Sequence, residues 1–200
     1  MKTWKLQENV FVKSDLKYIS NFILKTKKFT QGPKVKKFEK QFSNWNHSKY
    51  SIFVNSGSSA DFLIMSSAKE LYNWNDGDEI IVPSLTWPTQ VSSVIQCGLK
   101  PVFIDCNLED LSIDYSKLES CFSKKTKAIF IAHIMGFPAN IKKIRKIIGN
   151  RKIKIFEDCC ESIGARNPNK IGNIGVAGSF SFYWGHHMTT IEGGMITTNN

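Results

Sequence analysis

The chain has 200 residues, of which 42% are hydrophobic, and a formal net charge of +10 at pH 7. This length suits one compact domain with a sizeable core. No apolar run is long enough to span a bilayer, and the lysine-containing N-terminus is not followed by the apolar stretch of a secretion signal. We therefore expect neither membrane insertion nor secretion.

The positive charge has two explanations. A charge of +10 is compatible with nucleic acid, an anionic membrane or a phosphorylated substrate as partner. The lysines, however, gather on expected helices, where solvated faces account for them, and no nucleic-acid-binding module is recognisable. We expect no nucleic-acid partner. The five cysteines form no CxxC motif, which argues against a disulfide framework or a zinc ribbon and indicates the reducing cytoplasm.

Two amphipathic helices are predicted first. Residues 14–28 repeat apolar positions with a helical period, with Ser14 as the expected N-cap. Residues 30–33 contain Gly and Pro and interrupt this pattern. A second helix then places Phe38 and Phe42 on one face.

From residue 50 onward, short apolar runs alternate with helical patterns. Strands are predicted at 51–54, 79–82, 101–105, 128–132, 153–156, 179–182 and 195–198, and helices at 57–74, 86–96, 117–122 and 141–148. This alternation is typical of an α/β fold with a mainly parallel sheet and helices on both faces. Because the sequence ends directly after an expected strand, we expect 1–200 to be a truncated chain.

Three strand ends carry residues suited to ligand binding or catalysis. Asn55–Ala60 joins a strand to a helix, where small residues and free N–H groups favour a phosphate, although a plain N-cap has the same pattern. Trp87 follows another strand and would either stack on an aromatic cofactor or pack in the core. Asp158 ends a buried strand, as the partner of a protonated ring nitrogen or as an N-cap.

The two adjacent histidines have a different chemistry. His186 and His187 follow an expected strand, and side chains that alternate along a strand do not readily face one metal ion. A single histidine acting as a general base fits its near-neutral pKa better, so we expect no metal site. Glu157 and Glu161 would form an acid pair only in a geometry that their spacing does not establish.

Taken in order, these motifs resemble the DegT/DnrJ/EryC1/StrS sugar-aminotransferase family of fold-type I pyridoxal-phosphate enzymes. The resemblance covers almost the whole chain and is carried by Gln31–Pro33, Asn55–Ala60, Val82–Trp87, Pro101–Asp105, His133–Pro138, Glu157–Glu161, Ser181–Tyr183 and Glu192–Gly194. It implies that residues 1–200 form the N-terminal part and the large cofactor-binding domain, with a small C-terminal domain absent.

The resemblance also implies roles for individual residues toward pyridoxal 5′-phosphate or pyridoxamine 5′-phosphate. Gly57, Ser58 and Ser181 would hold the phosphate. Trp87 would stack on the pyridine ring, and Asp158 would pair with the ring nitrogen and keep it protonated.

The chain departs from the aminotransferase pattern at one decisive position. Aminotransferases of this family have the Schiff-base lysine where this chain has His186, and an imidazole cannot tether the cofactor covalently. His186 would instead move a proton at the C4′ carbon of the cofactor, with Tyr183 as a helper. Glu161 stands where the family usually has Gln or His near the ring hydroxyl.

This change resembles the branch of the family that removes the C-3 hydroxyl of nucleotide-linked 4-keto-6-deoxyhexoses. The implied reaction is a 3-dehydration in a homodimer, with the amine restored by glutamate or by an iron–sulfur partner. Two alternatives stay open: transamination of the 4-ketosugar, and a catalytically incomplete or non-catalytic chain.

Overall fold

The computed structural model describes Thr3 and residues 11–200; the lysine-containing start of the chain lies outside this part. The helices are α1 (Lys13–Lys25), α2 (Pro33–Asn46), α3 (Gly57–Leu71), α4 (Pro88–Gln96), α5 (Ile141–Ile148) and the 3-10 helix η1 (Leu118–Cys121). The strands are β1 (Tyr50–Val54), β2 (Glu79–Pro83), β3 (Lys100–Ile104), β4 (Thr126–Ala132), β5 (Lys154–Asp158), β6 (Ala177–Ser181) and β7 (Gly194–Thr198).

The strands form one seven-stranded sheet in the order β1-β7-β6-β5-β4-β2-β3. The pairs from β3 across to β6 are parallel, and β7 is antiparallel to both β6 and β1. β1 therefore runs in the same direction as β6, and the carboxyl ends of β1, β2, β4, β5 and β6 share one edge. The mainly parallel sheet predicted from the sequence is confirmed.

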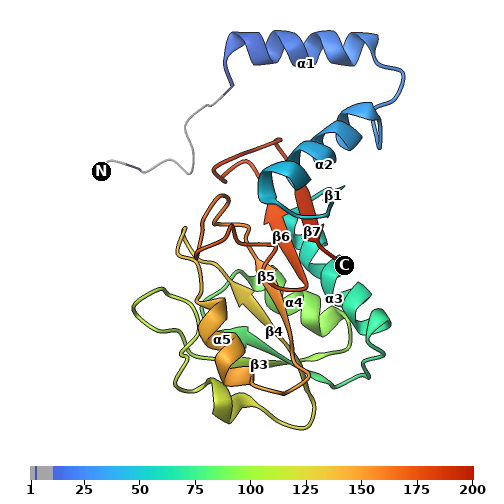
Figure 1. The fold of residues 1–200 in the computed structure, drawn as a ribbon. Helices are drawn as coiled ribbons and strands as arrows, with labels where there is room; N and C mark the ends of the chain where they lie inside the picture. The colour runs from blue at the N-terminus through green and yellow to red at the C-terminus, as the bar shows by residue number, and fades with distance from the viewer. Residues whose placement is uncertain (1–2, 4–10) are drawn as a thin grey trace.

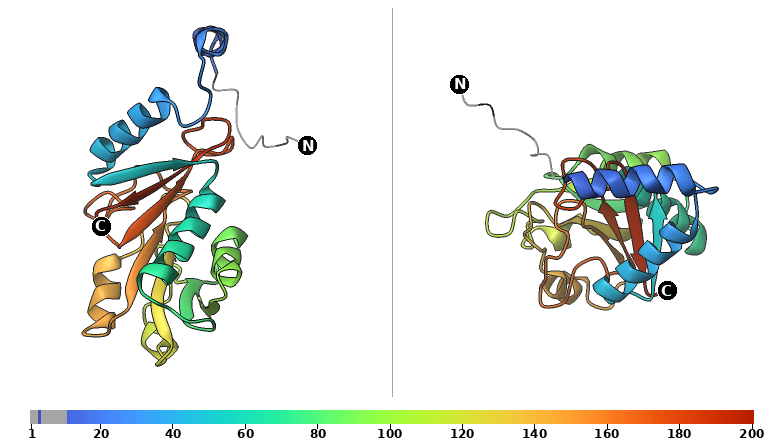
Figure 2. Two further views of the ribbon diagram at one scale, coloured as in Figure 1. Left: turned by 90° about the vertical axis from the view of Figure 1, so that its right-hand side faces the viewer. Right: turned by 90° about the horizontal axis from the view of Figure 1, so that it is seen from above.

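Helices cover both faces of this sheet. α3 and α4 lie on one face, and α5 and α2 lie on the other, as the turned view in Figure 2 shows. α1 lies away from the sheet at the top of Figure 1 and buries none of its residues. The apolar runs of the strands need this cover because both of their faces are buried.

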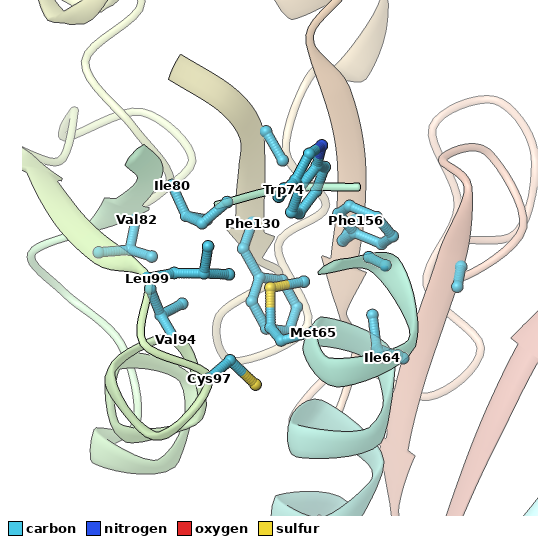
Figure 3. Packing of buried hydrophobic residues seen from close by; sticks show 13 residues of the cluster. Ile64, Met65, Trp74, Ile80, Val82, Val94, Cys97, Leu99, Phe130 and Phe156 are labelled. Atoms are coloured by element: carbon cyan, nitrogen blue, oxygen red, sulfur yellow. The ribbon is translucent and has the colours of Figure 1, made fainter. Parts of the chain in front are cut away.

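The face under α3 and α4 has a continuous apolar core. Met65 and Ile64 of α3 point toward Phe130 and Phe156 of the sheet, and Val94 of α4 packs on the same cluster (Figure 3). All five of these side chains are at most 4% exposed. This packing fixes α3 on the sheet and so places the start of α3 beside the strand ends.

A second, aromatic cluster lies on the opposite face. Phe38 and Phe42 of α2, which the sequence placed on one helix face, contact Phe180 and Phe182 with ring centroids 5.1–5.7 Å apart. This cluster holds α2 against β6 and its continuation, which leads into the two histidines.

Several helix boundaries differ from those predicted. α1 ends at Lys25 rather than residue 28, and the helix predicted at 117–122 is the shorter 3-10 helix η1, Leu118–Cys121. α3 ends at Leu71 rather than residue 74, because Asn73 adopts a left-handed φ of 52°. α4 begins only at Pro88, since the preceding Trp87 is extended, as a residue before proline usually is. α1 is capped at Val12 and not at Ser14, since the Asp15 carboxylate accepts the Val12 N–H at 3.2 Å.

Within the part of the chain that the structure describes, no helix combines the length and the apolar character required to cross a membrane.

Candidate active site

One cavity of about 990 Å³ opens at the shared carboxyl edge of the strands. All eight residues singled out from the sequence line it: Gly57, Ser58, Trp87, Asp158, Glu161, Ser181, Tyr183 and His186. They come from four separate segments of the chain, which the fold brings together at one edge of the sheet. Their individual roles stay predictions.

The start of α3 forms one wall of the cavity. The Ser56 side chain caps this helix by accepting the Ser59 N–H at 3.1 Å, and the Ala60 N–H binds the Ser56 carbonyl. The first N–H groups of a helix have no intrahelical acceptor. With those two N–H groups satisfied, the N–H groups of Gly57 and Ser58 remain to bind an anion.

Gly57 allows a very close approach between α3 and the end of β6. A Cβ at this position would lie 2.6 Å from the Ser181 Cβ and 2.8 Å from the Cys160 Sγ. No other residue type fits this cradle without displacing a neighbour. The Ser181 hydroxyl is thereby held next to the two helix N–H groups.

Asp158 ends β5 at the floor of the cavity. It is only 5% exposed, and its Oδ1 accepts the Cys160 N–H at 3.0 Å. Burial raises the pKa of this carboxyl, partly opposed by that hydrogen bond. Asp158 therefore accepts the local backbone hydrogen bond that the N-cap alternative predicts, and it also faces the cavity. A cationic partner in the cavity would offset the free-energy cost of burying its charge.

Trp87 lies at the cavity mouth. It is 62% exposed, which excludes the core-packing explanation. An exposed indole beside a concave site is a suitable surface for a planar ring.

His186 lies in the loop after β6, where its backbone N–H donates to the Tyr183 carbonyl at 3.1 Å. The two rings meet edge to face, with centroids 5.9 Å apart. Burial lowers the pKa of His186 below its ordinary 6.5; Glu161 opposes this shift and His187 adds to it. A lowered pKa keeps the imidazole neutral near pH 7, which is the state a general base needs.

The two glutamates of the 157–161 segment have different surroundings. Glu161 lines the cavity, and its Oε2 accepts the Met135 N–H at 3.3 Å. Glu157 is fully buried outside the cavity lining and lies 3.1 Å from the Nε2 of His133. The acid pair considered from the sequence does not form.

Glu157 instead belongs to a network that sequence reasoning missed. Its carboxylate accepts the N–H groups of Gly172, Ile174 and Gly175 at 2.6–2.8 Å. Burial raises the pKa of Glu157, but the hydrogen bond from His133 and these N–H groups outweigh it, and the net shift is downward. The only sequence signal was a carboxylate at the end of an apolar run.

His133 has both ring nitrogens engaged. Its Nδ1 accepts the Ala139 N–H at 3.0 Å, so its proton lies on Nε2, toward Glu157. Two groups of side chains have ligand atoms within 4.8 Å of one another: His133, Glu157 and Cys159, and Asp61, Asp158 and Cys160. Among the described residues, neither His186 nor His187 belongs to such a group.

A mainly parallel sheet with an anion-binding helix start, a buried carboxylate and an imidazole at one carboxyl edge is the large-domain arrangement of fold-type I pyridoxal-phosphate enzymes. The model of the DegT/DnrJ/EryC1/StrS aminotransferase family matches residues 12–200. The chain belongs to this family.

Two curated relatives with named activities resemble this chain. The chain is 40% identical over 190 residues to the GDP-4-keto-6-deoxy-D-mannose 3-dehydratase of Escherichia coli O55:H7, covering 93% of this chain and 49% of the relative. It is 32% identical to the GDP-perosamine synthase of Escherichia coli O157:H7, covering 92% and 50%. The chain thus spans about half the length of the curated relatives it matches.

Solved structures support the same family assignment. The Escherichia coli GDP-4-keto-6-deoxy-D-mannose 3-dehydratase with bound hydrated pyridoxal phosphate superposes with a TM-score of 0.93 at 37% identity, covering 100% of this chain and 52% of the other. The same dehydratase with a trapped pyridoxal phosphate–glutamate geminal diamine also gives 0.93 at 37% identity, covering 99% and 52%.

Proposed function

We propose that this chain supplies the cofactor-binding half of an enzyme that removes the C-3 hydroxyl of a nucleotide-linked 4-keto-6-deoxyhexose. The observation that carries this proposal is His186, a half-buried imidazole at the position where aminotransferases of the family have their lysine. No lysine is among the residues that line the cavity in the described part of the chain. The 3-dehydratase relative at 40% identity supports the same reaction.

The residues present fit pyridoxal or pyridoxamine phosphate. The two N–H groups at the start of α3 and the Ser181 hydroxyl suit a phosphate. Asp158 suits a protonated ring nitrogen, and Trp87 offers a ring face. When bound, pyridoxamine phosphate supplies an amine that reacts with a ketone and a ring that accepts electrons.

The remaining chemistry belongs to side chains of this protein. Neutral His186 would take a proton at the C4′ carbon of a bound cofactor. Asp158 holds the charge of the ring nitrogen in a buried setting, where a Coulomb interaction is stronger than in water. Tyr183 would orient the His186 ring through its edge contact, and it lines the same cavity. Glu161 faces the same space and opposes the effect of burial on His186.

We further propose that glutamate restores the amine, that the full-length protein is a homodimer, and that it acts in the cytoplasm. The glutamate adduct trapped in a relative supports the first of these. Five free cysteines support a reducing compartment. The homodimer rests on the family resemblance.

The second candidate function is transamination of the 4-ketosugar. GDP-perosamine synthases at 32% identity favour it, since they belong to the same family. It requires a lysine to anchor the cofactor in place of His186.

Trapping with borohydride separates the two reactions. Full-length wild type, His186→Lys and His187→Lys are incubated with pyridoxal phosphate, reduced with borohydride, and analysed by intact mass and absorbance. We expect reduced cofactor on His186→Lys only. His187→Lys tests whether a lysine elsewhere in the cavity lining is trapped, because His187 also lines the cavity but is exposed where His186 is half-buried.

The product decides the reaction itself. With glutamate and a nucleotide-linked 4-keto-6-deoxyhexose, we expect wild type to release ammonia and form a 3-deoxy sugar. Cofactor fixed to the wild-type chain, together with a 4-aminosugar as the product, would overturn the dehydratase proposal in favour of transamination.

A further inference from the structure

A second buried carboxyl lies directly behind Asp158. Asp61, in the second turn of α3, is 1% exposed, and its Oδ1 accepts a hydrogen bond from the Ser179 Oγ at 2.6 Å. Ligand atoms of Asp61, Asp158 and Cys160 all lie within 4.8 Å of one another. Asp61 does not line the cavity, so it is shielded from a bound cofactor by Asp158 and its neighbours.

This pair lacks a basic partner. In the described residues, no lysine, arginine or histidine forms a salt bridge with either carboxyl. His133 influences Asp158 but has both ring nitrogens engaged by Ala139 and Glu157. Two carboxylates that share a buried site without a cation repel each other strongly, and such pairs retain a proton.

We propose that Asp61 and Asp158 share a single proton at neutral pH and that Asp61 holds it, which makes Asp61 a positioning residue that keeps Asp158 as the one carboxylate facing the cavity. The role toward a ring nitrogen rests on the function proposed above. The shared proton itself does not depend on that function, because it follows from the burial and proximity of the two carboxyls alone.

The hydrogen bonds assign the proton to Asp61. Asp158 accepts the Cys160 N–H, which stabilises its ionised form. Within the described part of the chain, Asp61 accepts hydrogen bonds from two neutral hydroxyls, those of Ser179 and Thr89. Burial, and then the charge of Asp158, raise the pKa of Asp61 well above its ordinary value, so Asp61 is the last of the two to ionise.

The other groups around the pair do not compensate a second charge. Burial raises the pKa of the Cys159 and Cys160 thiols far enough to keep both neutral near pH 7. Glu161 adds negative charge and raises the pKa of Asp158 further. In the described part of the chain, the groups that face the pair are the two thiols, the two hydroxyls, Glu161, and His133 with both ring nitrogens engaged. The pair therefore carries one negative charge, which suits one cation.

Infrared spectroscopy of the cofactor-free full-length protein detects the proton directly. At pH 7.5, wild type should show the carbonyl stretch of a buried protonated carboxylic acid. Asp61→Asn should lose this band. Asp158→Asn should keep it, since burial is the largest cause of the raised pKa at Asp61. Glu70→Gln, an exposed position on the same helix, should keep it as the matched control.

The pH dependence of unfolding is an independent readout. A carboxyl that stays protonated when folded and ionises when unfolded makes stability fall as pH rises above its ordinary pKa of about 3.9. The unfolding equilibrium constant of wild type relative to Asp61→Asn should therefore rise with pH above that value, by up to about tenfold per pH unit for as long as Asp61 stays protonated in the folded state. Glu70→Gln should remain parallel to wild type.

Three results overturn the proposal: no protonated-acid band in wild type, a band that survives Asp61→Asn but is lost in Asp158→Asn, or a stability ratio that does not change with pH. If Asp61→Asn does not fold, the spectra of wild type and Asp158→Asn still decide the matter. None of these measurements uses cofactor or sugar. A failed turnover assay would therefore contradict the proposed function without contradicting the shared proton.

Discussion

Replacing Gly57 by alanine tests the close contact on which the anion site depends. The new Cβ would lie 2.6 Å from the Ser181 Cβ, 2.8 Å from the Cys160 Sγ and 3.2 Å from the Ser181 Oγ. The Ser181 Cβ is attached to a buried strand and cannot rotate away, so α3 or β6 must shift. Overpacking of this kind costs about 1–3 kcal/mol.

Helix propensity opposes this cost. Alanine is better than glycine in a helix interior by about 1 kcal/mol, and less at the first position. We therefore expect a net loss of about 1–2 kcal/mol in the free energy of unfolding. The affinity for pyridoxal phosphate should fall by a larger fraction than the free energy of unfolding does, because the displaced N–H groups of Gly57 and Ser58 are those that we propose bind the phosphate.

Denaturant unfolding of the cofactor-free full-length protein and a fluorescence titration with pyridoxal phosphate measure the two effects. Ser58→Ala is the matched control, since it adds no atom and keeps the backbone N–H; it should leave stability nearly unchanged. Adding Ser181→Gly removes the shortest contact and should recover part of the stability lost in Gly57→Ala. Wild-type stability in Gly57→Ala, or no recovery in the double variant, would refute the reasoning.

Two further predictions concern titratable groups. Because burial lowers the pKa of His186 and only the neutral imidazole accepts a proton, the acidic limb of the kcat profile should lie below pH 6.5, and a limb above that value would contradict the assigned base. Glu157→Gln places an amide N–H₂ against N–H donors and should cost about 3–5 kcal/mol in thermal or denaturant unfolding. The cavity-facing Glu161→Gln should cost far less, and equal losses would show that the network is not what stabilises this region.

The sequence predicted most of the fold because its strong signals are local. The apolar runs that became β4 and β5 are bounded by polar residues, and α5 has the predicted bounds, 141–148. Errors occurred where a single backbone angle decides a boundary, as at Asn73. The order of strands in the sheet depends on contacts between distant segments, for which the sequence has no comparable local pattern.

The candidate site was foreseen at residues next to strand ends, since those ends share an edge in any parallel sheet. Asp61 and His133 were not foreseen as partners of Asp158 and Glu157. Asp61 lies inside a helix, where a single acid is usually a solvated residue, and only the packing of α3 on the sheet turns it toward β5. A pairing of residues almost a hundred positions apart has no local signature.

Under the function proposed above, the arrangement of charge is compatible with a histidine at position 186 that changes the reaction rather than abolishing it. The groups that would hold the cofactor, the start of α3 and Asp158, depend on backbone and buried contacts that do not involve His186. A site built in this way keeps its anion and its ring nitrogen partner without a covalent tether. In that proposal, His186 lacks the amine that would release an aminosugar, but its lowered pKa leaves it neutral and able to accept a proton.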